Sequence, residues 1–114
     1  MDLYKLYWVG QGKIRPGKFS EAIQWWTEKA APDILSDPWT KSLKCYASQF
    51  GLGGEYTIEI WQEIESYGSF DEMDEFWVKE SDASKKKLEI MKEGNEYFEW
   101  GPSRLMGDWP ESSY

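Results

Sequence analysis

The side chains with the most chemical potential in this sequence are one carboxylate and several aromatic rings on stretches that read as strands. Glu59 and Trp61 lie in the alternating stretch 56–65, and Tyr7 and Tyr46 lie in two other stretches rich in ring and aliphatic residues. Rings around a carboxylate make a mostly apolar pocket with few polar anchors, which is typical of a small-molecule site. A Glu in such surroundings has a raised pKa and can act as a general base. We therefore predict that Tyr7, Tyr46, Glu59 and Trp61 bind a ligand, with Glu59 as the candidate catalytic group.

A structural role for the same side chains stays open at this point. Lys5 shares the predicted face with Glu59, so the two charges can form an ion pair without any catalytic purpose. The rings can equally pack in an interface between subunits. The sequence alone does not separate these alternatives from a ligand site.

The composition excludes several kinds of chemistry. The chain has no His, which removes serine-type triads, His-ligated haem and the commonest zinc sites. Its one cysteine, Cys45, forms no intramolecular disulfide and no multi-cysteine metal cluster. We expect neither a metal nor a cofactor.

The charge balance limits the partners. The chain has 13 Lys and Arg against 21 Asp and Glu, a formal net charge of −8. Nucleic acids and anionic membranes bind basic surfaces, so we expect neither as a partner. No apolar stretch reaches the roughly 18 residues of a membrane span. An unpaired cysteine and the absence of a signal-peptide pattern predict a cytoplasmic protein.

The spacing of apolar residues predicts strands and helices in one domain, residues 1–114, with a core over about 3–100 and an irregular tail over 101–114. Alternating or ring-rich stretches indicate strands, and apolar residues three and four apart indicate helices. The predicted order is a strand at 3–9, a helix from 18 to Pro32, strands at 42–50 and 56–65, helices from 69 and over 83–95, and a strand at 97–100. This order is typical of an α+β ferredoxin-like βαββαβ domain with a four-stranded antiparallel sheet.

Local signals set the expected element ends. Ser69 and Glu72 have the spacing of a capping box, and Ser81 with Asp82 indicates a second helix start. Residues 51–54, Gly-Leu-Gly-Gly, indicate a hairpin turn between the second and third strands. Phe19, Ala22, Ile23, Trp26 and Ala30 form the predicted apolar face of the first helix.

Both faces of the predicted sheet carry large apolar side chains, although helices cover only one face in this fold. In the first strand, Leu6 and Trp8 alternate with Tyr7 and Val9. A second face rich in rings exposes more apolar surface than soluble monomers usually tolerate. A two-fold dimer that packs sheet on sheet removes that surface from water, so we predict a homodimer, with higher assembly left open.

Three segments together resemble the dimeric α/β-barrel superfamily. These segments are Pro16-Gly17-Lys18-Phe19 with the tryptophans that follow it at 25 and 26, the strand 56–65, and the stretch 69–77. The resemblance implies that two ferredoxin-like subunits join their sheets into one barrel. Superfamily members include cofactor-independent monooxygenases, haem-degrading enzymes, lactone isomerases and proteins of unknown function. Members that degrade haem hold its iron through a His, which this chain lacks.

The sequence thus favours a small homodimeric protein that binds an apolar or aromatic molecule beside the sheet. The first alternative, which the resemblance implies, is a cofactor-independent monooxygenase or isomerase with Glu59 as its base. The second alternative is a structural protein whose barrel is filled by its own side chains.

Overall fold

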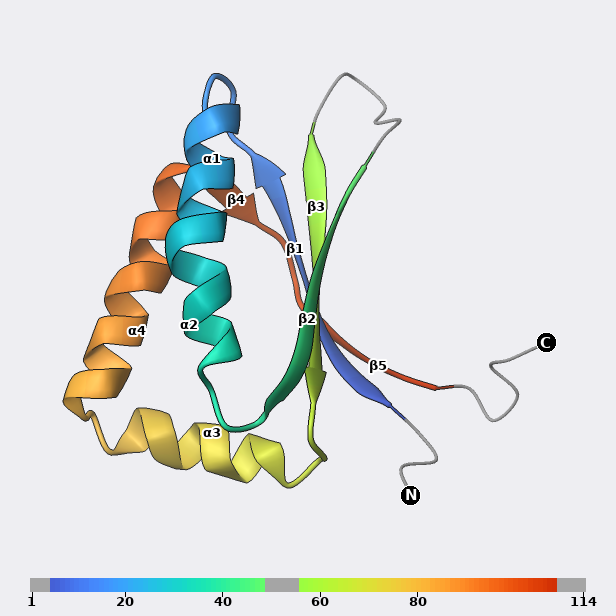
Figure 1. The fold of residues 1–114 in the computed structure, drawn as a ribbon, viewed down its shortest axis with the longest axis vertical. Helices are drawn as coiled ribbons and strands as arrows, with labels where there is room; N and C mark the ends of the chain where they lie inside the picture. The colour runs from blue at the N-terminus through green and yellow to red at the C-terminus, as the bar shows by residue number, and fades with distance from the viewer. Residues whose placement is uncertain (1–4, 49–55, 109–114) are drawn as a thin grey trace.

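The computed structural model describes residues 5–48 and 56–108, and it places all the helices on one face of an antiparallel sheet (Figure 1). The elements follow the predicted order, which confirms the α+β ferredoxin-like class. They are β1 (Leu6–Ile14), α1 (Phe19–Trp25), η1 (Trp26–Ala30), α2 (Ala31–Leu35), β2 (Thr40–Ala47), β3 (Thr57–Ile64), α3 (Ser69–Val78), α4 (Asp82–Glu93), η3 (Gly94–Glu96), β4 (Phe98–Trp100) and β5 (Arg104–Gly107). The predicted hairpin turn at 51–54 lies outside the described residues, although β2 and β3 pair antiparallel as expected.

The register of the sheet assigns each side chain to one of two faces. The strand order is β2-β3-β1-β4, and β5 also pairs with β1. Trp8 of β1 lies opposite Gln62 of β3, and Val9 lies opposite Trp61. Because side chains alternate along a strand, Trp8 and Gln62 share the face of the buried Ile14, which packs against α1. We call this the inner face, and we call the face of Val9 and Trp61 the outer face.

The first helical region contains a π-helical turn that carries the chain past the end predicted at Pro32. The backbone N–H of Ala31 donates to the carbonyl of Trp26, five residues earlier, and the helix then continues as α2 to Leu35. Pro32 is tolerated because it occupies the first turn of α2, where a missing N–H costs little. The prediction that the helix ends at Pro32 was therefore wrong.

The π-turn also changes which side chains of this region face the sheet. Trp25 and Ala30, five residues apart, are both buried, whereas Lys29 points outward and its Nζ lies 2.8 Å from Glu93 Oε1 of α4. Phe19 and Ile23 were predicted on the apolar face, but each is about half exposed. The buried stripe is centred on Ala22 and Trp25 instead.

The second helical region confirms one predicted cap and contradicts the other. Ser69 is the first residue of α3 and not its cap, because its hydroxyl accepts a hydrogen bond from the Ser66 backbone N–H at 3.2 Å. The predicted capping box with Glu72 was therefore wrong. Ser81 is the N-cap of α4, and its Oγ accepts the Ser84 backbone N–H at 3.2 Å.

Ser81→Ala should lower the free energy of unfolding by about 1 kcal/mol, because it removes the acceptor for an otherwise unpaired helix N–H. Chemical denaturation measures the change. Ser20→Ala is the matched control, since Ser20 is exposed within α1, and it should stay within about 0.5 kcal/mol of wild type. Equal stability of Ser81→Ala and wild type would contradict the assigned cap.

The C-terminal segment forms a fifth strand where the sequence predicted an irregular tail. β4 pairs with Gly12–Ile14 of β1, and β5 pairs with Leu6–Val9 farther along the same edge. The Gly101-Pro102 break interrupts the pairing without ending it. The backbone N–H of Gly101 donates to the carbonyl of Gln11 at 2.9 Å, which holds the chain against β1 before β5 begins.

The hydrophobic core lies between α1, η1 and the inner face of the sheet. Its buried members are Ile14, Ala22, Trp25, Ala30, Ile58 and Phe98. Within residues 5–48 and 56–108, every helix is too short or too polar to span a lipid bilayer.

Candidate functional site

The structure brings the four sequence-predicted site residues together on the outer face. The ring centroid of Trp61 lies 5.4 Å from that of Tyr7 and 6.3 Å from that of Tyr46, both edge-on. The indole Nε1–H of Trp61 donates to Glu59 Oε1 at 2.9 Å, and Arg104 Nη2 lies 3.1 Å from Glu59 Oε2. The cation paired with Glu59 is thus Arg104 of β5.

The pKa of Glu59 is shifted in the direction opposite to the sequence-based expectation. The hydrogen bond from Trp61, then that from Arg104, stabilises the carboxylate and lowers its pKa below the ordinary value. The expectation of a raised pKa was wrong, because no sequence pattern indicated that β5 would bring Arg104 to this carboxylate. A Glu with a lowered pKa is a poor general base at neutral pH.

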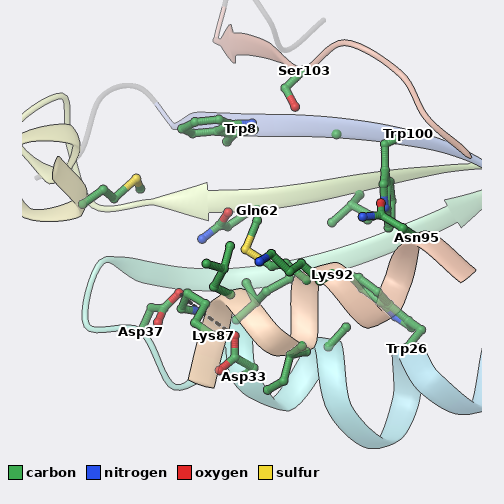
Figure 2. Close-up of a pocket in the computed structure, with 18 of the residues that line it drawn as sticks. Trp8, Trp26, Asp33, Asp37, Gln62, Lys87, Lys92, Asn95, Trp100 and Ser103 are labelled. Carbon is green, nitrogen blue, oxygen red and sulfur yellow. Dashed lines mark hydrogen bonds and ion pairs between the residues drawn. The ribbon is translucent and has the colours of Figure 1, made fainter. Parts of the chain in front are cut away.

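A cavity of about 520 Å³ lies on the opposite side, between the inner face and the helices (Figure 2). Six of the seven tryptophans within residues 5–48 and 56–108 line it, together with aliphatic and methionine side chains from both helical regions. The tryptophans are Trp8, Trp25, Trp26, Trp39, Trp77 and Trp100. The four outer-face residues are not among the lining residues. The cavity is therefore a second candidate site, separate from the predicted one.

Two glycines make room for the indoles at the cavity wall. A Cβ on Gly94 would lie 2.5 Å from Cη2 of Trp25, and a Cβ on Gly12 would lie 2.8 Å from Cε3 of Trp100. Trp25 also contacts Trp100, with ring centroids 6.2 Å apart. These close approaches fix the indoles against η3 and β1, so this part of the wall is preformed.

The opposite end of the cavity is polar. Lys87 Nζ of α4 lies 2.5 Å from Asp33 Oδ2 of α2 and 3.0 Å from Asp37 Oδ2 in the connection to β2. All three side chains are largely buried and all three line the cavity. Figure 2 shows them gathered at one end, with Trp26 and Trp100 at the other. The cavity thus joins an aromatic end to a charged end.

The pKa of Asp37 in this cluster differs from the ordinary value of an aspartate. Burial is the main cause and raises its pKa above the ordinary 3.8, and the hydrogen bond and charge of Lys87 oppose that rise. A nearby polar pair extends the polar wall, since Gln62 Nε2 donates to Thr40 Oγ1 at 2.8 Å and Gln62 also lines the cavity.

The sequence contained part of the signal for this cavity. Trp8 and Trp100 fell on predicted strands, and Trp25 and Trp26 on the first predicted helix, so a gathering of rings between the layers could have been inferred. The charged end had no such signal. Asp33 and Asp37 lay in a stretch predicted as a connection, and Lys87 lay in a run of three lysines that favours a solvated helix face.

Comparison with known proteins places the chain among several solved structures of the same fold. It is similar to a conserved protein from Methanosarcina mazei Go1, with a TM-score of 0.59 and 16% identity over 92% of this chain and 91% of that one. It is also similar to an uncharacterized NIPSNAP domain protein from Burkholderia xenovorans, with a TM-score of 0.65 and 15% identity over 89% of this chain and 91% of that one.

A third similar structure is an ethyl tert-butyl ether D (EthD) family protein from Bacillus halodurans C-125, with a TM-score of 0.60 and 13% identity over 92% of this chain and 97% of that one. No protein-family model matches the chain, and no curated protein matches it either. These structural likenesses confirm the α+β ferredoxin-like fold that the sequence predicted.

Proposed function

We propose that this protein binds an apolar, aromatic small molecule in the cavity between the sheet and the helices. The observation that carries the proposal is a space of about 520 Å³ with six tryptophans in its wall and its charged groups confined to a few positions. Small-molecule sites have this character, a concave and mostly apolar surface with a few polar groups that orient the ligand. The predicted outer-face site has the rings and the carboxylate, but its residues do not line this cavity.

We propose further that the outer face is the interface of a homodimer. Tyr46 and Met106 on this face are exposed hydrophobic residues, and the Trp61 ring, which contacts Tyr46, is itself partly exposed. Packing a second copy against this face would remove the rings from water, which is the usual driving force for such interfaces. In this arrangement the four sequence-predicted residues hold two subunits together, and the ligand occupies the cavity of each one.

The lowered pKa of Glu59 favours binding over the alternative of a monooxygenase or isomerase that uses Glu59 as its base. A general base works best when its pKa lies near the working pH. The Glu59 carboxylate is instead held in its charged form by Trp61 and Arg104.

Gly10→Leu should weaken ligand binding while the protein stays folded. Gly10 lines the cavity from the inner face of β1, and a Cβ there would meet only Ser103 Oγ, at 4.0 Å. The leucine side chain therefore enters the cavity without a clash near the backbone, and Leu suits a strand better than Gly. We expect affinity for a naphthalene-based probe to fall at least about tenfold, a loss of about 1.4 kcal/mol, as measured by isothermal titration calorimetry.

Two controls make this test specific. Glu89→Leu adds the same side chain at an exposed position of α4 and should bind the probe like wild type. Gly10→Ala adds one methyl group and should keep most of the affinity. Equal probe binding by Gly10→Leu and wild type would contradict the cavity as the binding site.

A further inference from the structure

We propose that the ligand of this cavity carries a positively charged amine as its polar head group, held by Asp33 and Asp37. This inference rests on the proposed binding function and names the chemical class of its ligand. The proposed ligand is a molecule with an aromatic body and a basic nitrogen at one end.

The charge count at the buried end of the cavity is the first support. Two carboxylates face a single ammonium group, because Lys87 pairs with both Asp33 and Asp37. The side chains of Lys87, Asp33 and Asp37 are 9%, 19% and 10% exposed, so solvent compensates little of the excess negative charge. A ligand ammonium would balance that charge, whereas a ligand carboxylate would add to it.

The burial of Asp37 is the second support. Removal from water is the main reason that its carboxyl resists ionisation, and Lys87 only partly offsets this cost. A second cation beside Asp37 would favour the ionised form of its carboxyl group. Binding of that cation would therefore offset part of the cost of burying this carboxylate. The ion pairs of Lys87 with Asp33 and Asp37 then hold both carboxylates in the wall of the cavity.

The walls of the cavity suit the same ligand. Trp39, two residues after Asp37 in the sequence, lines the cavity, as do Trp8 and Trp77. The face of an indole ring attracts cations more strongly than any other aromatic side chain. Trp26 and Trp100 at the far end offer surface for the aromatic body (Figure 2). The separation of the two ends matches a molecule with its amine at one extremity.

One further charged group of the described residues lines the cavity. Lys92 lies five residues after Lys87 on α4, but its side chain is exposed. Solvent and salt screen an exposed charge far more than a buried one, so Lys92 weighs less than the buried carboxylates in selecting the head group. The excess negative charge of the buried groups therefore favours a cationic head group on the ligand.

The test uses three probes that share one aromatic body, 2-(1-naphthyl)ethylamine, 2-(1-naphthyl)ethanol and 1-naphthylacetic acid, titrated into the full chain by calorimetry at neutral pH. We expect the amine to bind at least about tenfold more tightly than the alcohol, and the acid to bind most weakly. Asp37→Asn should remove most of this preference, because it removes one of the two carboxylates that attract the amine. Asp74→Asn, an exposed substitution on α3, should keep the preference.

The outcomes separate the two proposals. An alcohol or acid that binds wild type as tightly as the amine overturns the head-group inference and leaves the cavity proposal standing. Failure of all three probes to bind, or equal binding to Gly10→Leu, overturns the cavity proposal itself. An amine preference that survives in Asp37→Asn and in Asp33→Asn places the amine elsewhere and also overturns the inference. If neither Asn variant folds, the ranking of the three probes on wild type decides.

Discussion

Lys87→Met should lower the free energy of unfolding by about 3–5 kcal/mol at neutral pH, the largest effect we expect from any single substitution outside the aromatic core. Met keeps the apolar stem of the lysine but removes the ammonium group between Asp33 and Asp37. Two largely buried carboxylates then lose their shared cation, and each must either remain charged without a partner or take up a proton. Urea denaturation followed by circular dichroism measures the loss.

Two variants show whether the loss comes from the charges. Lys86→Met changes the neighbouring lysine, which is exposed, and should be nearly neutral. Adding Asp33→Asn and Asp37→Asn to Lys87→Met removes the unpaired charges and should recover part of the stability. A triple variant that is no more stable than Lys87→Met would show that lost packing, and not lost charge, causes the effect.

The destabilisation by Lys87→Met should depend on pH with a definite sign. In the wild type, burial raises the pKa of Asp37 and Lys87 opposes that rise, so without Lys87 the pKa rises further. A carboxyl whose pKa is higher in the folded than in the unfolded state loses stability as the pH rises through the interval between the two values. The difference between Lys87→Met and wild type should therefore shrink as the pH falls toward 3.8, the ordinary aspartate value. A difference that does not change with pH would contradict this reasoning.

Trp61→Glu should convert the protein to monomers and raise the dimer dissociation constant at least about thirtyfold, which corresponds to about 2 kcal/mol. The substitution removes the ring that contacts both Tyr7 and Tyr46 on the outer face. It also places a second carboxylate beside Glu59, where the indole N–H now donates. Light scattering coupled to size-exclusion chromatography, run over a concentration series, measures the change.

The matched control introduces the same charge away from the sheet. Val78 at the end of α3 is 80% exposed, so Val78→Glu should keep the oligomeric state of the wild type. Tyr46→Glu, a second outer-face variant, should weaken the dimer in the same direction if Trp61→Glu proves insoluble. A dimer that survives both outer-face charges would exclude this face as the interface.

The fold followed from the sequence wherever local signals and packing agreed. The alternation over 56–65 and the Ser81 cap both predicted what the structure has, because each depends on neighbours in the sequence. The predicted cap at Ser69 was wrong because the Ser69 hydroxyl accepts a hydrogen bond from the Ser66 backbone N–H, which precedes the helix. Pro32 misled because a π-turn precedes it and lets the helix continue. Such turns depend on tertiary packing and leave no periodic pattern to detect.

The candidate site was less predictable because its residues meet only through the tertiary fold. The outer-face cluster was foreseen, since Glu59 and Trp61 are two residues apart on one strand. Arg104, which changes the electrostatics of that cluster, came from a segment predicted to be irregular. Asp33 and Lys87 are 54 residues apart and meet because α2 and α4 pack side by side on the inner face (Figure 1). Neither residue alone indicated a site.

Because six indoles surround one cavity, the intrinsic tryptophan fluorescence of the protein should report on whether the cavity is occupied. Indoles as close as Trp25 and Trp100, 6.2 Å between centroids, exchange excitation energy efficiently. Light absorbed by one indole of the cavity wall is therefore emitted mainly by the neighbouring indole whose excited state has the lowest energy. A molecule that enters the cavity changes the polarity around several tryptophans at once. It also quenches tryptophans that transfer their excitation energy to neighbouring rings. The intrinsic ultraviolet emission of the unmodified chain should consequently follow the occupancy of the cavity, with no label attached.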